Sequence, residues 1–175
     1  VGSEMCIRDR YYFMESSERV EKLKDIFKQC VNKMLKDDYY LIKNDSHEGS
    51  ISFRIGHYLE NKLKESSDFN GFVVDLEYNR NLDNIKSLEG KKVRPDLIVH
   101  KRGENGPSYN LMVVEIKKHT APCYEKDRDC DKLKKFISEE YGFQYEIGGM
   151  LIINCVEKSE NIRWFKNGKE EKQKD

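Results

Sequence analysis

The sequence lacks a net charge, a long apolar run and any closely paired cysteines. Its 32 basic residues are balanced by 32 acidic ones, which counts against a protein that coats nucleic acid by charge alone. No apolar run approaches the roughly 20 residues that a transmembrane helix needs, so we expect no membrane partner. The five cysteines form no CxxC pair, and their odd number argues against a disulfide framework. These absences favour a protein of the reducing cytoplasm.

Zinc is disfavoured by the same cysteines. His119, Cys123 and Cys130 are close enough in sequence to be considered as ligands, but their spacing fits no common zinc pattern. A fourth ligand is also missing.

The length of 175 residues suits one domain, and the chain contains no internal repeat or linker. The first ten residues resemble translated sequencing-adapter fragments, so we expect residues 1–13 to be a non-native extension and Met14 to be the natural start. They contain no apolar segment of the kind found in a signal peptide. We assign residues 14–165 to a single domain and expect residues 166–175 to form a charged, frayed tail.

Two amphipathic helices are predicted in the first third of the chain. Apolar residues recur every three or four positions from Glu15 to about Lys36 and again from residue 51 to residue 63. Asp45 and Ser46 offer capping side chains for the second helix, which should end near Lys64.

The remainder of the chain predicts strands with one further helix. We expect strands over residues 72–78, 94–101 and 111–118, separated by a polar connection at 79–92 and a turn cluster at 103–107. A helix should follow over about 127–141, then a buried strand at 148–154 and an edge strand at 162–165. This order indicates an α/β fold with a mixed central sheet flanked by helices.

Two of these strands contain charged residues within apolar segments. Asp96 lies in the stretch Arg94–Val99, and Glu115 and Lys117 lie in Val113–Lys117. Side chains alternate along a strand, so Glu115 and Lys117 share one face. Burying such groups is costly unless they are paired or bound to a metal, so these strands are expected to build a site. The alternative is a surface pair between Glu115 and Lys117, with Asp96 as a turn residue.

The two stretches resemble the signature of the PD-(D/E)xK nuclease superfamily. Pro95-Asp96 and Glu115-Ile116-Lys117 stand about twenty residues apart, as in that signature. The resemblance covers about residues 46–155 and implies the restriction-endonuclease-like core, a three-layer fold in the order αβββαβ. It also implies Mg²⁺ or Mn²⁺ held by Asp96 and Glu115 with the Ile116 carbonyl, and a Lys117 side chain that orients water or stabilises phosphate charge.

A third carboxylate often comes from the preceding helix in this superfamily. At about 100° per residue, Glu48 falls on the apolar face of the predicted second helix, whereas Glu60 points towards solvent. Glu48 is therefore the predicted third metal ligand. The alternative for Glu48 is a helix N-terminal glutamate favoured by the helix dipole.

Other charged residues near the motif have weaker assignments. Glu77 is expected to support the metal site, to bind the metal itself, or to pair with Arg54 or Arg94. Arg94 and Lys118 are candidate phosphate contacts, although a solvated charged face explains them equally well. Residues 74–80 and 98–103 also resemble stretches in one uncharacterised prokaryotic branch of the superfamily.

The resemblance implies a magnesium-dependent nuclease that hydrolyses phosphodiester bonds, with DNA as the favoured nucleic-acid partner. The alternative is a non-catalytic module of the same fold that binds nucleic acid or protein. A third, weaker option is a regulatory or immunity-type protein. A homodimer is compatible with the resemblance. The sequence does not distinguish DNA from RNA or an endonuclease from an exonuclease.

Overall fold

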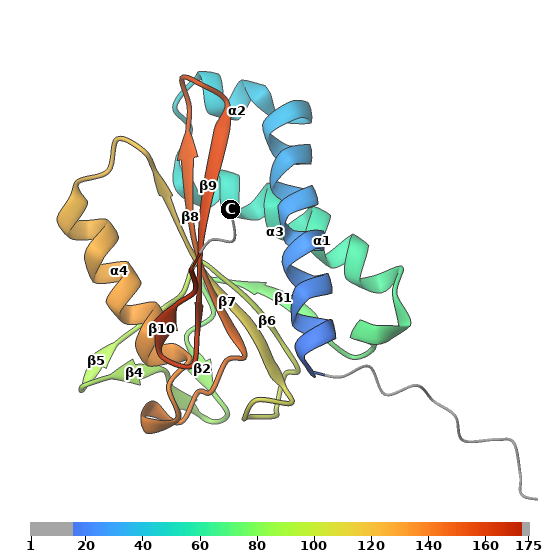
Figure 1. Cartoon of the computed structure of the whole chain (residues 1–175), viewed down its shortest axis with the longest axis vertical. Coiled ribbons are helices and arrows are strands. Elements are labelled where there is room, and N and C mark those ends of the chain that lie inside the picture. The colour runs from blue at the N-terminus through green and yellow to red at the C-terminus, as the bar shows by residue number, and fades with distance from the viewer. Residues whose placement is uncertain (1–15, 173–175) are drawn as a thin grey trace, which may run out of the picture.

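The computed structural model describes residues 16–172 and is built around a mixed six-stranded sheet in the order β1-β6-β7-β8-β9-β10 (Figure 1). The helices are α1 (Ser16–Asp37), α2 (Tyr39–Lys43), α3 (Glu48–Lys64) and α4 (Cys123–Phe136), with short 3₁₀ helices η1 (Ser67–Phe69) and η2 (Glu139–Tyr141). The strands of the main sheet are β1 (Val73–Leu76), β6 (Leu97–His100), β7 (Asn110–Lys118), β8 (Ile147–Asn154), β9 (Ser159–Lys166) and β10 (Lys169–Glu170).

Helices cover both faces of this sheet. Strands β1, β6 and β7 are antiparallel neighbours, whereas β7 and β8 run parallel. A parallel pair needs a crossover connection, and α4 supplies it on one face of the sheet. Helix α3 packs against β1 and β7 on the opposite face, and α1 packs against α3 (Figure 1). The predicted α/β class with a mixed central sheet is confirmed.

The two predicted N-terminal helices form with the expected apolar faces. Val20, Phe27 and Val31 of α1 are buried, as are Ile55 and Leu59 of α3. The predicted cap of α3 was wrong. His47 precedes the first turn, and its Nδ1 accepts a hydrogen bond from the Gly49 N–H, whereas Ser46 and Asp45 lie one and two residues before the capping position.

Three element boundaries also differ from the prediction. The polar connection at 79–92 contains two small hairpins, β2 (Arg80–Asn81) with β3 (Asn84–Ile85), and β4 (Ser87–Leu88) with β5 (Lys91–Lys92). Helix α4 begins earlier than predicted, at Cys123, and ends earlier, at Phe136. Strand β9 is not the sheet edge, since β10 pairs with it. Part of the predicted charged tail is therefore ordered as a strand.

Strand β7 is buried on both faces and separates two apolar cores. Val114 and Ile116 pack in the core beneath α1 and α3, whereas Val113 packs with Leu133 and Phe136 of α4. Alternation therefore directs Glu115, like Val113, towards α4. The candidate site thus forms between the sheet and α4 (Figure 1).

The sequence also predicted a non-native N-terminal extension and the absence of a membrane span. The predicted non-native extension, residues 1–13, and the predicted start Met14 lie outside the described residues. Within residues 16–172, none of the helices combines the length and the apolar character that crossing a membrane requires.

Candidate metal and phosphate site

Asp96 and Glu115 lie next to each other across two antiparallel strands. Leu97 pairs with Val114, and the same register extended by one residue places Asp96 opposite Glu115. The Asp96 Oδ2 atom accepts a hydrogen bond from the Ile116 N–H at 2.7 Å. The strand pairing thus brings together the two carboxylates predicted to hold a metal.

Glu115 is almost fully buried, with 1% of its surface exposed. Its Oε2 atom lies 2.8 Å from the Lys132 ammonium of α4. Its Oε1 atom is inaccessible and has no hydrogen-bond partner within the described residues. A buried carboxylate oxygen without a partner is costly, so Oε1 is the atom best suited to receive an added ligand.

Lys117 is held by groups from three elements. Its Nζ donates to Glu48 Oε2 and to the Ile116 carbonyl, both at 3.1 Å, and lies 3.5 Å from Asp129 Oδ2. The Glu48 Oε1 atom accepts a hydrogen bond from the Lys118 N–H at 3.2 Å. Glu48 is therefore tied to the end of β7 through both carboxylate oxygens.

Helix α4 contributes two charged residues that the sequence analysis did not identify. Asp129 is buried, and its Oδ1 lies 3.2 Å from Lys132 Nζ. The helical period contained a signal, because Asp129 precedes Leu133 by four residues and Phe136 by seven, and both are buried. A carboxylate in line with two core residues could have been recognised as part of a site.

These residues form one carboxylate–lysine cluster, with four acidic and two basic side chains: Glu48, Asp96, Glu115, Asp129, Lys117 and Lys132. Four negative and two positive charges leave a formal charge of −2. Arg128 also approaches Asp129, at 3.9 Å, but most of its side chain is exposed.

Burial and ion pairing act in opposite directions on these groups. Burial raises the pKa of Glu115 well above its usual range, and the Lys132 ammonium opposes this effect. Burial also raises the pKa of Asp96, while the hydrogen bond from Ile116 lowers it. For Lys117, burial acts to lower the pKa, but the hydrogen bond to Glu48 and the nearby carboxylates raise it overall. A bound cation would favour the ionised form of both carboxyl groups.

The fit to a metal rests on two carboxylates rather than three. Within residues 16–172, no group of three or more His, Cys, Asp or Glu side chains is arranged to hold an ion. Glu48 contacts Lys117 and the Lys118 amide instead of joining Asp96 and Glu115. Mg²⁺ is often bound by one or two carboxylates, with water and substrate phosphate completing its ligands. Asp96 and Glu115 fit that donor set.

The surrounding residues are already engaged in ion pairs. Glu77 is exposed and lies 3.3 Å from Arg94, which is the pair that the sequence offered as one alternative for this residue. Lys118 Nζ contacts Asp45 at 2.6 Å. Glu60 pairs with Lys64 away from the cluster, as its predicted orientation requires. Arg94 and Lys118 would have to exchange these partners to contact a phosphate.

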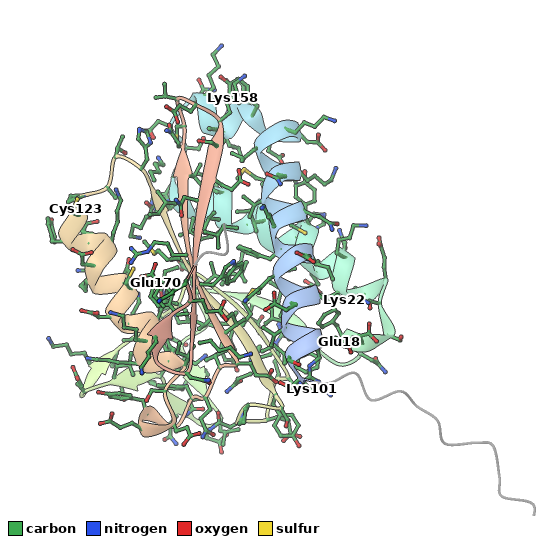
Figure 2. All side chains as sticks on the ribbon, in the orientation of Figure 1. Glu18, Lys22, Lys101, Cys123, Lys158 and Glu170 are labelled. Carbon is green, nitrogen blue, oxygen red and sulfur yellow. The ribbon has the colours of Figure 1, made fainter. Side chains whose placement is uncertain are left out.

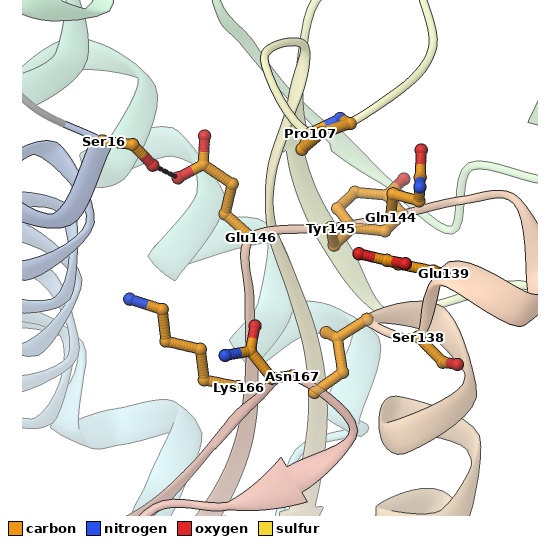
Figure 3. Close-up of a pocket in the computed structure, with 10 residues that line it drawn as sticks. Ser16, Pro107, Ser138, Glu139, Gln144, Tyr145, Glu146, Lys166 and Asn167 are labelled. Carbon is orange, nitrogen blue, oxygen red and sulfur yellow. Dashed lines mark hydrogen bonds between the residues drawn. The ribbon is translucent and has the colours of Figure 1, made fainter.

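Two other candidate sites are separate from this cluster. Cys130 is buried, whereas Cys123 is exposed at the start of α4 (Figure 2), and within the described residues they form no metal-binding group with His119. A cavity of about 470 Å³ lies between the start of α1, the segment after α4 and the β9–β10 turn (Figure 3). None of the cluster residues lines it.

Comparisons with known proteins found no match. No family model matches the chain, and no match was found to a curated protein or to a solved structure.

Proposed function

We propose that this protein is a metal-dependent nuclease of the PD-(D/E)xK type, which hydrolyses phosphodiester bonds, with DNA as the favoured substrate. One observation carries the proposal. Asp96 and Glu115 lie opposite each other, each with one oxygen already bonded, beside the ammonium groups of Lys117 and Lys132. Such a site combines oxygen ligands for a hard cation with positive charge for a phosphate.

The order of elements supports the same proposal. Helix α3 is followed by the antiparallel strands β1, β6 and β7, then by α4 and the parallel strand β8. This succession corresponds to the αβββαβ order that the resemblance implies. Fold alone does not establish chemistry, so the proposal depends on the site residues.

Each residue of the site has a distinct role in this proposal. Asp96 and Glu115 would hold Mg²⁺ or Mn²⁺, which when bound lowers the pKa of water and stabilises charge on phosphate. Lys117 would donate a hydrogen bond to the attacking water or to a phosphate oxygen. Glu48 restricts the Lys117 side chain by accepting a hydrogen bond at 3.1 Å, which reduces the conformational entropy lost on substrate binding.

A non-catalytic binding module is the second candidate. Both lysines of the cluster are paired with carboxylates, and within the described residues no three-carboxylate metal group is present. A module that binds nucleic acid or protein through its surface would not require Lys117 for binding. Loss of function on changing Lys117 alone therefore separates the two candidates.

The test is cleavage of labelled DNA and RNA, single-stranded, double-stranded and branched, with Mg²⁺, Mn²⁺ or EDTA. We expect metal-dependent cleavage by the full chain and a loss of about 10²–10³-fold in Lys117→Met, since one donor to the transition state is removed. Lys134→Met is the matched control, because Lys134 pairs with Asp131 on α4 and is not part of the cluster. Absence of cleavage on every substrate, or equal cleavage by Lys117→Met, would contradict the proposal.

A further inference from the structure

We propose that Lys132 and Asp129 of α4 are positioning residues that orient the Glu115 carboxylate for the metal. This inference rests on the proposed function, because it concerns the same cation. It adds two residues from a helix outside the sequence motif.

A lysine of α4 contacts one carboxylate oxygen of Glu115. Lys132 Nζ lies 2.8 Å from Glu115 Oε2, and Asp129 Oδ1 lies 3.2 Å from the same ammonium. Asp129 and Lys132 are three residues apart and therefore share one face of the helix. With Oε2 held in this way, Oε1 remains without a partner within the described residues. The pair thus selects which carboxylate oxygen can bind a cation.

Asp129 links the two lysines of the cluster. Its Oδ1 lies 3.2 Å from Lys132, and its Oδ2 lies 3.5 Å from Lys117. One buried carboxylate therefore sets the positions of the lysine that holds Glu115 and of the lysine proposed to act on water or phosphate. Side chains that orient metal ligands commonly change metal affinity by about 10–100-fold when they are removed.

A contribution to the stability of the fold does not explain why Asp129 and Lys132 form an ion pair at this position. Asp129 is 3% and Lys132 is 22% exposed in their side chains, and both lie beside the apolar residues Leu133 and Phe136. Buried ion pairs often contribute less to stability than well-packed apolar side chains of similar volume. Helix α4 could bury an apolar face here, so the charged pair is better explained by its contact with Glu115.

The experiment measures Mn²⁺ binding by isothermal titration calorimetry, without substrate. We expect Lys132→Met to bind Mn²⁺ about 10–100-fold more weakly than the wild-type chain, because Glu115 loses the group that holds Oε2. Lys132→Arg keeps a cationic donor and should recover part of the affinity. The matched control is Lys134→Met, since Lys134 forms an i,i+3 pair with Asp131 on the exposed side of the same helix.

Asp129→Asn covers the possibility that Lys132→Met does not fold, because it preserves side-chain volume and keeps an acceptor for Lys132. It should also weaken Mn²⁺ binding. Unchanged or tighter binding in the folded variants, with wild-type binding intact, would overturn the inference and leave the proposed function standing. Absence of Mn²⁺ binding by the wild-type chain would overturn both.

Discussion

Lys86 offers a quantitative test of how this fold accommodates a buried charge. It lies between the two small hairpins, where its N–H donates to the Asn79 carbonyl and its carbonyl accepts from the Val93 N–H. The residue is 3% exposed, and its Nζ donates a hydrogen bond to the Tyr145 hydroxyl at 2.7 Å. The rings of Tyr78 and Tyr145 lie 5.0 and 5.3 Å from the ammonium. Lys86 thus connects the segment that precedes Asp96 to the sheet.

Burial lowers the pKa of Lys86 from its ordinary value of 10.5 to about 8. Between these two values the unfolded chain binds a proton that the folded chain does not, so stability rises with pH. At 1.36 kcal/mol per pH unit, the full cost of burying the charge is about 3 kcal/mol, and it is present below pH 8. About 2 kcal/mol of it should be recovered between pH 7 and 9.5. Attraction of the ammonium to the two rings reduces this recovery to between about 1 and 2 kcal/mol.

The assay is urea unfolding of the wild-type chain and Lys86→Met at pH 7, 8, 9 and 9.5. The stability of the wild-type chain relative to Lys86→Met should rise by about 1–2 kcal/mol over this range. The Tyr145 hydroxyl loses its partner in the variant, at a cost of about 1–3 kcal/mol that is the same at each pH. Lys92→Met is the control, because Lys92 is exposed in the same segment. A difference between wild type and Lys86→Met that does not change with pH would refute the reasoning.

Two further substitutions test the cluster and the core. Glu115→Gln should remove Mn²⁺ binding, and its Tm relative to that of the wild-type chain should be higher at pH 8 than at pH 5. Burial raises the pKa of Glu115, so the wild-type chain loses stability as pH rises through that value, whereas glutamine does not titrate; a Tm difference that is equal at both pH values would contradict this. Gly149→Ala should cost about 1–3 kcal/mol in urea unfolding, because a Cβ there would lie 2.9 Å from Trp164 Cζ3, and Trp164 packs against Phe27. Gly148→Ala is its control, since its nearest neighbour is at 3.4 Å, and equal destabilisation of both variants would show that the Trp164 contact is not the cause.

Local periodicity was enough to predict most elements of the fold. The steps of three and four residues in α1 and α3, and the alternation in β1 and β7, reflect helix and strand geometry that each segment carries by itself. The same alternation predicted that Glu115 and Lys117 share a face. The hairpins of residues 80–92 and the start of α4 were missed, because short polar segments have little periodicity to detect.

Distances between elements required the tertiary structure. Glu48 was predicted as a metal ligand from the family resemblance and its helical face, and in the structure it contacts Lys117, which is 69 residues away in sequence. The face of a helix shows that a side chain points inward and does not show which atoms it meets. The Lys132–Glu115 pair depends on the packing of α4 against β7, and Lys86 meets Tyr145 only because the 79–92 segment folds back onto the sheet. The sequence by itself determined that Asp96, Glu115 and Lys117 lie in apolar strands and that Glu115 and Lys117 share a face. Packing of the elements decided their partners and added Asp129 and Lys132, because those contacts join segments that local geometry does not relate.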